Sequence, residues 1–106
     1  MNNPNTTLSI EITYDEVAAL QNAFVIDCRT EEEFDAGHLA HACNIPLQHL
    51  SVRKDDFPCK CDDNFFVYCK SGNRSGTFAT YLRSIGYTKC QSIEGGYEQW
   101  GDRSSC

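Results

Sequence analysis

Two short, unbroken apolar runs constrain the fold of this chain more than any other feature. Residues 24–26 read Phe-Val-Ile, and residues 65–68 read Phe-Phe-Val-Tyr. Runs of this kind are typical of strands that are buried on both faces of a sheet. A T-x-x-E sequence, which marks the start of a helix, follows the first run at residues 30–33, and another stands at residues 13–16. Strands that alternate with helices predict an α/β domain with a parallel sheet and helices on both faces.

The other expected elements follow from alternation, helical spacing and turn residues. We expect further strands at residues 8–12, 42–45 and 90–93, and helices at residues 14–21, 31–36, 46–53, 75–85 and 97–102. A chain of 106 residues has room for one domain. We place this domain at residues 8–106, after a disordered polar leader at residues 1–7.

The charge and the cysteine content narrow the class of protein. Fifteen acidic and nine basic residues give a net charge of −6, and no basic cluster is present, so we expect no nucleic-acid partner. No apolar run approaches the length of a membrane span, and residues 1–7 lack the features of a secretory signal. We therefore expect a cytoplasmic protein with no membrane partner. Its seven cysteines are then expected to be thiols, without a disulfide framework.

The polar segment after the second apolar run carries the chemistry. The run delivers Cys69 to the carboxyl end of the sheet, where ligands bind in parallel α/β folds. The residues that follow are small or polar, and two of them are cations: Lys70, Ser71, Gly72, Asn73, Arg74 and Ser75. In such a loop at a helix N-terminus, backbone N–H groups can form a nest that binds anions and favours a cysteine thiolate. The pattern predicts that Cys69 is a nucleophile for an anionic substrate.

This loop resembles the active-site loop of the rhodanese (sulfurtransferase) family. Further pieces in the family's order resemble its other signatures: Val-Ile-Asp-Cys-Arg at residues 25–29, Glu-Glu-Phe at residues 32–34, Gly-His-Leu at residues 37–39, Asn-Ile-Pro at residues 44–46, and Glu-Gly-Gly at residues 94–96 followed by Trp100. The resemblance covers nearly the whole chain. Any one piece is weak, but together, in this order and spacing, they are specific.

The resemblance implies a single-domain rhodanese fold around a five-stranded, mainly parallel sheet. It implies that Cys69 takes a sulfane sulfur from a donor such as thiosulfate, releases sulfite and becomes a persulfide. A thiophilic acceptor then removes the sulfur. The implied partners are a small anionic sulfur donor and a thiol or protein acceptor, with no metal or organic cofactor. Lys70 and Arg74 would supply positive charge, and the backbone N–H groups of residues 71–75 would cradle the sulfur.

Two other functions stay open at this point. The same fold could act as a protein-to-protein persulfide carrier or interaction module, with thiosulfate turnover only incidental. Related phosphatases and arsenate reductases have five residues between the cysteine and the arginine of the loop, whereas four residues separate Cys69 from Arg74. This spacing matches the sulfurtransferase loop and disfavours a phosphatase or an arsenate reductase.

The remaining polar residues and cysteines have simpler interpretations. Asp27 and Arg29 flank the end of a predicted strand, and we expect a supporting ion pair. Cys28, Cys43 and Cys90 fall on strand positions where the family usually has Val or Ile, so we expect small buried apolar residues.

The motifs assign no role to three other cysteines or to the histidines. Whether Cys59, Cys61 or Cys106 resolves the Cys69 persulfide stays open. No histidine has neighbours at a metal-ligand spacing, so we expect no metal site. His41 stands where family members usually have a small residue, often glycine.

Overall fold

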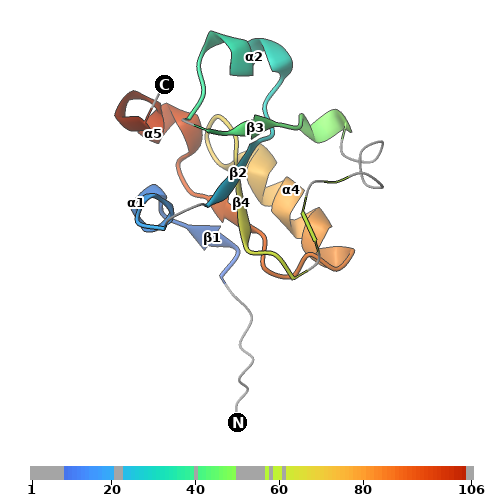
Figure 1. The fold of residues 1–106 in the computed structure, drawn as a ribbon. Helices are drawn as coiled ribbons and strands as arrows, with labels where there is room; N and C mark the ends of the chain where they lie inside the picture. The colour runs from blue at the N-terminus through green and yellow to red at the C-terminus, as the bar shows by residue number, and fades with distance from the viewer. Residues whose placement is uncertain are drawn as a thin grey trace.

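The fold was obtained as a computed structural model, which describes residues 9–20, 23–39, 41–49, 57, 59–60 and 62–104. Within these residues the chain forms a five-stranded sheet in the order β1-β5-β4-β2-β3, and the paired strands are parallel (Figure 1). The elements, in chain order, are β1 (Glu11–Ile12), α1 (Tyr14–Ala18), β2 (Phe24–Asp27), α2 (Glu31–Ala36), β3 (Cys43–Asn44), the 3₁₀ turn η1 (Leu47–His49), β4 (Phe65–Tyr68), α4 (Asn73–Ser84), β5 (Gln91–Ile93) and α5 (Gly96–Ser104). The predicted α/β class and mainly parallel sheet are confirmed.

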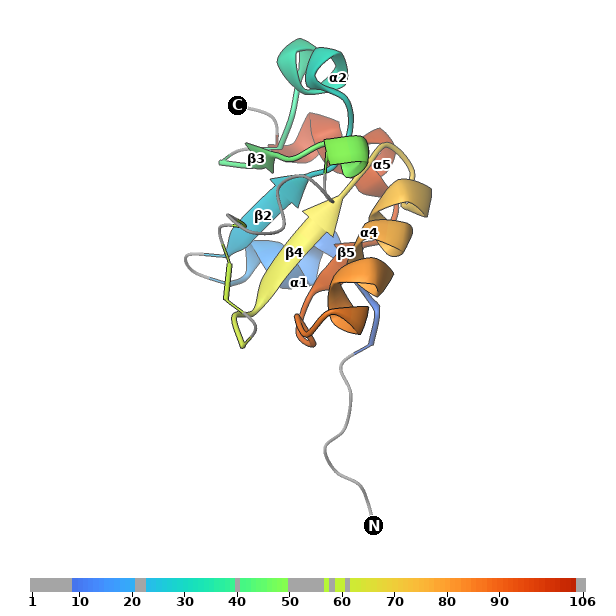
Figure 2. The same ribbon diagram turned by 90° about the vertical axis from the view of Figure 1, so that its right-hand side faces the viewer.

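Helices cover the sheet on both faces. In Figures 1 and 2, α4 lies on one face, and α1 and α5 lie on the other. Two cores result from the alternation of side chains along β4. Val67 packs with Phe78 and Leu82 of α4, whereas Phe66 packs with Val17 of α1 and Trp100 of α5. The central strand β4 is therefore buried on both sides, as its unbroken apolar run predicts.

The two predicted helix starts are confirmed as capping boxes. The Thr13 hydroxyl accepts a hydrogen bond from the Glu16 backbone N–H, and the Glu16 carboxylate accepts one from the Thr13 N–H. Thr30 and Glu33 make the same reciprocal pair at the start of α2. Each box satisfies backbone donors that the first helical turn leaves without partners.

Several predicted boundaries differ from the structure. Helix α4 begins at Asn73, two residues before the predicted start, because Gly72 takes a left-handed conformation (φ 110°) and forms the N-cap. Helix α5 begins at Gly96, where a turn was predicted. The helix predicted at residues 46–53 is a 3₁₀ turn as far as it is described, and residues 50–53 lie outside the described part. The predicted leader at residues 1–7 also lies outside it.

His41 has an unusual backbone conformation. Its φ of 66° lies in the left-handed region, and among the described residues it is the one non-glycine residue with a positive φ. Glycine adopts this region without a steric cost, whereas a residue with a Cβ is strained there. This conformation explains physically why a small residue would be expected at the position.

Candidate active site

The site lies where β2 and β4 end side by side. Asp27 and Tyr68 are register partners, and the Cys28 N–H donates to the Tyr68 carbonyl over 3.0 Å. The next residues along the two strands are Cys28 and Cys69. Both side chains are 1% exposed and belong to the same buried cluster against α4. The parallel sheet therefore places a second cysteine directly beside the predicted nucleophile.

The loop after Cys69 directs hydrogen-bond donors at its sulfur. The Gly72 backbone N–H donates to the Cys69 Sγ over 3.0 Å. The hydroxyl and backbone N–H of Ser75 also lower the pKa of Cys69, and the same hydroxyl lies 3.2 Å from the Gly72 carbonyl, which can accept its hydrogen bond. The buried Ser75 hydroxyl is held in place by the Ser92 hydroxyl, at 2.7 Å. Donors from Gly72, the N-cap of α4, and from Ser75 in its first turn thus face the Cys69 sulfur, and that the loop of residues 70–75 binds a substrate stays a prediction.

These contacts give Cys69 an acidic thiol. A hydrogen bond from the Cys28 side chain is the largest cause. Together with the donors from Ser75 and Gly72, it outweighs the opposing effect of burial and lowers the pKa of Cys69 to about 4. A thiol with this pKa is almost entirely thiolate at neutral pH, whereas an ordinary cysteine is only a few per cent ionised there. The Cys69 sulfur therefore carries the negative charge that a sulfur nucleophile needs.

The two cations of the loop have different surroundings. Arg74 forms a bidentate ion pair with Glu33 of α2, with Nη1 to Oε1 at 3.0 Å and Nη2 to Oε2 at 3.2 Å. This pairing lowers the pKa of Glu33 to about 2 and raises that of Arg74. Lys70 is exposed and, with Arg29, Glu33 and Tyr97, lines a small pocket of about 240 Å³. Arg74 is thus paired with a carboxylate, whereas Lys70 is exposed at the pocket.

Asp27 and Arg29 form the expected ion pair, which is buried. The Arg29 Nη2 lies 2.7 Å from the Asp27 Oδ2, and the Tyr68 hydroxyl donates to the same oxygen over 2.7 Å. The Arg29 guanidinium also donates to the Gly37 carbonyl over 2.6 Å and stacks on the Tyr97 ring, 4.3 Å from its centroid. The cluster ties β2, β4 and the start of α5 together beneath the site, which fits a supporting role.

The start of α5 fixes the first two residues of the loop. The Tyr97 N–H donates to the Cys69 carbonyl over 2.8 Å, and the Glu98 N–H donates to the Lys70 carbonyl over 2.9 Å. Gly96 makes this approach possible, since its φ is +57° and a Cβ there would collide with both carbonyl groups. The Gly-Gly pair of the sequence thus serves the geometry of the Cys69 loop.

Sequence reasoning missed three residues of the site. Cys28 was expected to be only a small buried residue, yet it hydrogen-bonds to Cys69. Ser92 holds the Ser75 hydroxyl, and Glu33 pairs with Arg74. Ser92 stands beside the polar Gln91 in a strand of three residues, so the local sequence did not single it out. The proximity of Cys28 depends on which strand pairs with β4, and the local sequence carries no such information.

Three other cysteines are described, and all are free thiols: Cys43, which is half-buried and not fully buried as expected, Cys59 and Cys90. Cys59 and Cys90 are buried, and burial raises the pKa of each thiol to about 12. Cys61 and Cys106 lie outside the described residues, so their predicted roles stay predictions. Among the described residues, no group of three or more His, Cys, Asp or Glu side chains could hold a metal ion. No described helix is both long enough and apolar enough to cross a bilayer.

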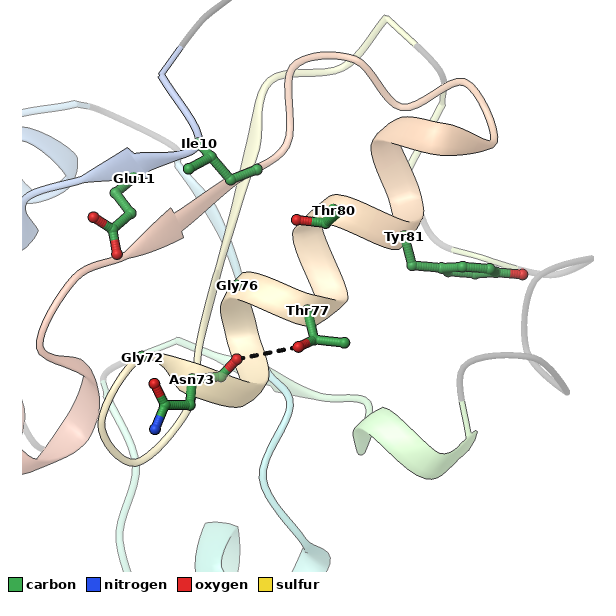
Figure 3. Close-up of a pocket in the computed structure, with 8 residues that line it drawn as sticks. All are labelled: Ile10, Glu11, Gly72, Asn73, Gly76, Thr77, Thr80 and Tyr81. Atoms are coloured by element: carbon green, nitrogen blue, oxygen red, sulfur yellow. Dashed lines mark hydrogen bonds between the residues drawn. The ribbon is translucent and has the colours of Figure 1, made fainter.

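A larger hollow adjoins the outer side of the loop (Figure 3). It has a volume of about 570 Å³ and lies between α4 and the start of β1. Its lining is mostly small and uncharged, formed by Ile10, Glu11, Gly72, Asn73, Gly76, Thr77, Thr80 and Tyr81. These eight residues include no cysteine, histidine or cation. The hollow therefore adds no titratable side chain to the Cys69 loop other than Glu11 and Tyr81.

Comparisons with known proteins agree with the fold described above. The family model for the rhodanese-like domain matches residues 13–103. The protein YqhL of Bacillus subtilis is 37% identical over 86 residues, which cover 81% of this chain and 67% of that protein. The chloroplastic thiosulfate sulfurtransferase 16 of Arabidopsis thaliana is 32% identical over 102 residues, covering 87% and 85% of the two chains. The crystal structure of a rhodanese-like domain protein from Staphylococcus aureus matches with a TM-score of 0.81 and 26% identity, covering 92% and 97%.

Proposed function

The chain belongs to the rhodanese-like family of sulfurtransferases, and we propose that it transfers a sulfane sulfur through a persulfide on Cys69. One observation carries this proposal. The Cys69 Sγ accepts a hydrogen bond from the Gly72 N–H at 3.0 Å, and its pKa is lowered to about 4, with the Cys28 hydrogen bond as the largest cause. The sulfur is therefore ionised at neutral pH and held at the start of α4.

In the first half-reaction, the Cys69 thiolate attacks the terminal sulfur of a donor such as thiosulfate. The S–S bond of the donor breaks, and sulfite leaves with the bonding electron pair. Cys69 then carries the outer sulfur as a persulfide anion. The N–H groups of Gly72 and Ser75, which now donate to the thiolate, are placed to stabilise the transferred negative charge.

In the second half-reaction, the sulfur passes to an acceptor. A thiolate, on a small molecule or on a protein, attacks the outer sulfur of the persulfide. The Cys69 thiolate leaves and takes the bonding electrons back. A thiol with a pKa of about 4 is a good leaving group, because leaving ability in sulfur exchange rises as the pKa falls. The same stabilisation thus serves both half-reactions.

A small anionic donor fits the surroundings of the loop. The Cys69 side chain is only 1% exposed, which favours a donor that presents a single terminal sulfur atom. The exposed cation Lys70 at the adjoining pocket can attract an anion. A relative at 32% identity is named a thiosulfate sulfurtransferase. Since the reaction needs a free thiolate, we also propose a reducing compartment, the cytoplasm, as its location.

Mass spectrometry of the reduced protein after incubation with thiosulfate tests the proposal. We expect the intact protein to gain the mass of one sulfur atom, and the gain to map to the peptide that contains Cys69. Cys69→Ser should show no gain, and Cys90→Ser should behave like the wild type. No gain with thiosulfate, while Cys69 is still readily alkylated, would reject thiosulfate as the donor. A gain from a protein persulfide alone would then favour the carrier function.

A further inference from the structure

The position of Cys28 relative to Cys69 fits a disulfide. Their strands are parallel neighbours in register, with Ile26 opposite Val67 and Asp27 opposite Tyr68. The next pair is therefore Cys28 and Cys69, on strands about 4.8 Å apart. This spacing lies within the range of roughly 4.4–6.8 Å between Cα atoms that disulfides accept. Both side chains point to the same face, because both belong to the cluster against α4.

The two side chains also differ in protonation state: Cys69 is a thiolate, and Cys28 is a neutral thiol. Cys69 holds the negative charge, and Cys28 remains protonated because its hydrogen bond to Cys69, followed by burial, raises its pKa far above the usual range. The parallel register places the two cysteines side by side, and each one shifts the pKa of the other. Oxidation of Cys69 removes the negative charge that keeps Cys28 protonated, so Cys28 becomes easier to deprotonate only when it has an electrophilic sulfur beside it.

We propose that Cys28 and Cys69 form a dithiol redox site, in which Cys28 captures a peroxide-oxidised Cys69 as a reversible disulfide. The Cys69 thiolate attacks one oxygen of hydrogen peroxide, the O–O bond breaks, and Cys69 becomes a sulfenic acid. The other oxygen leaves with the bonding electron pair as hydroxide, which takes a proton from the solvent to form water. The Cys28 sulfur then attacks the Cys69 Sγ and the S–O bond breaks. The hydroxyl group leaves as water with the thiol proton. Overall two thiols lose two electrons, and hydrogen peroxide is reduced to two water molecules.

This site rests on the strand register and not on the sulfur-transfer function. A dithiol reductant of the thioredoxin or glutaredoxin class would return the disulfide to two thiols by exchange. Without Cys28, the sulfenic acid would react further to the sulfinic and sulfonic acids, which a dithiol does not reduce. The consequence of the pair is that the low-pKa thiolate, which is the most easily oxidised group of the site, has a protected oxidised form.

The experiment treats the reduced full chain with a small excess of hydrogen peroxide and maps the products without reduction. Trypsin releases Cys28 in peptide 1–29 and Cys69 in peptide 61–70, which also contains Cys61. A further chymotryptic cut after Tyr68 separates Cys61 from Cys69. We expect a protein lighter by two hydrogens, with the link between Cys28 and Cys69. Dithiothreitol should restore alkylation of Cys69.

Matched variants make the test specific. Cys28→Ser keeps a hydrogen-bond donor but cannot form the disulfide, and Cys28→Val keeps an apolar residue of similar size if the serine variant does not fold. Both substitutions remove the Cys28 thiol that favours the Cys69 thiolate, so each variant is treated until the same fraction of the Cys69 thiol is consumed. In both, we expect the consumed Cys69 that dithiothreitol recovers to fall at least about tenfold, with sulfinic acid in its place. Cys90→Ser, at the opposite edge of the sheet, should recover like the wild type.

Three outcomes would overturn the proposal. They are a link from Cys69 to a different cysteine, equal irreversible oxidation of Cys69 with and without Cys28, or no oxidation of Cys69 at all. None of them depends on sulfur transfer, so failure here and failure of the proposed function are distinguishable.

Discussion

Cys69 and Cys90 are buried to the same degree but differ sharply in acidity. Their side chains are 1% and 0% exposed, and both belong to the core beneath α4. The pKa of Cys90 is raised to about 12, with burial as the largest cause, whereas that of Cys69 is lowered to about 4, with the Cys28 hydrogen bond as the largest cause. Burial by itself makes a thiol inert, and only donors directed at the sulfur reverse its effect.

The position in the sheet explains the difference. Cys69 follows β4 at the carboxyl edge, where the N-terminus of α4 presents backbone N–H groups. Cys90 precedes β5 at the amino edge, and the Arg83 guanidinium beside it donates to its carbonyl oxygen over 2.8 Å. A parallel α/β sheet concentrates anion-stabilising groups at one edge. Cys90, which is buried and has a raised pKa, can serve as an internal reference in each test of Cys69.

The largest expected effect comes from Gly96→Ala, which should displace the Cys69 loop. A Cβ at this position collides with the carbonyl groups of Cys69 and Lys70, and the φ of +57° adds strain. We expect the unfolding free energy to fall by about 1–3 kcal/mol and the alkylation rate of Cys69 by roughly tenfold or more. Thermal unfolding and iodoacetamide labelling measure the two effects.

Gly76→Ala is the matched control, because a Cβ there meets no atom within 4 Å. Gly76 lies inside α4, where alanine should raise the stability by about 0.4–1 kcal/mol. Cys90 should stay unlabelled in both variants as long as they are folded. Equal behaviour of the two variants would contradict the role given to Gly96.

A smaller effect is expected from Ser75→Ala, which should raise the pKa of Cys69 toward that of Cys90. With a pKa of about 4, the wild-type Cys69 is ionised across the neutral range, so its alkylation rate should be nearly independent of pH above about pH 6 and fall near pH 4. Removing the Ser75 hydroxyl removes one stabilising donor, and the inflection should rise by about one unit or more.

Ser84→Ala controls for the loss of a hydroxyl from the same helix. Ser84 is exposed, and its hydroxyl donates to the Tyr81 carbonyl, far along α4 from Cys69. Its pH profile should match that of the wild type. If the pH profiles of the wild type, Ser75→Ala and Ser84→Ala superimpose, the stabilising role of Ser75 is rejected.

The smallest effect is expected from Glu33→Gln, which should increase the positive charge that Arg74 offers at the Cys69 loop. The substitution keeps the shape of the side chain and removes the charge that Arg74 now faces at 3.0 Å. The freed positive charge should lower the KM for thiosulfate roughly twofold to fivefold, in keeping with a partly exposed ion pair. Steady-state kinetics measure it, with Glu32→Gln in the same helical turn as control. A raised KM would show that Arg74 needs its partner for correct placement.

The local sequence predicted most elements of the fold. The apolar run at residues 65–68 is a strand buried on both faces, and the two capping boxes start helices where expected. The start of α4 was predicted too late because a glycine in the left-handed region can serve as an N-cap. That conformation depends on the loop closing around the Cys69 sulfur, which short-range patterns do not encode.

Cys69, the loop of residues 70–75 and the Asp27–Arg29 pair could be chosen from the sequence because each is a short, contiguous pattern of residue types. The tertiary structure decided what depends on distant segments meeting. It paired β2 with β4, which brings Cys28 to Cys69 across 41 positions of the chain, and it placed Ser92 against Ser75 and Glu33 against Arg74. The physical reason is that hydrogen bonds and ion pairs act over a few ångströms in space, and the register of a parallel sheet determines which residues lie that close.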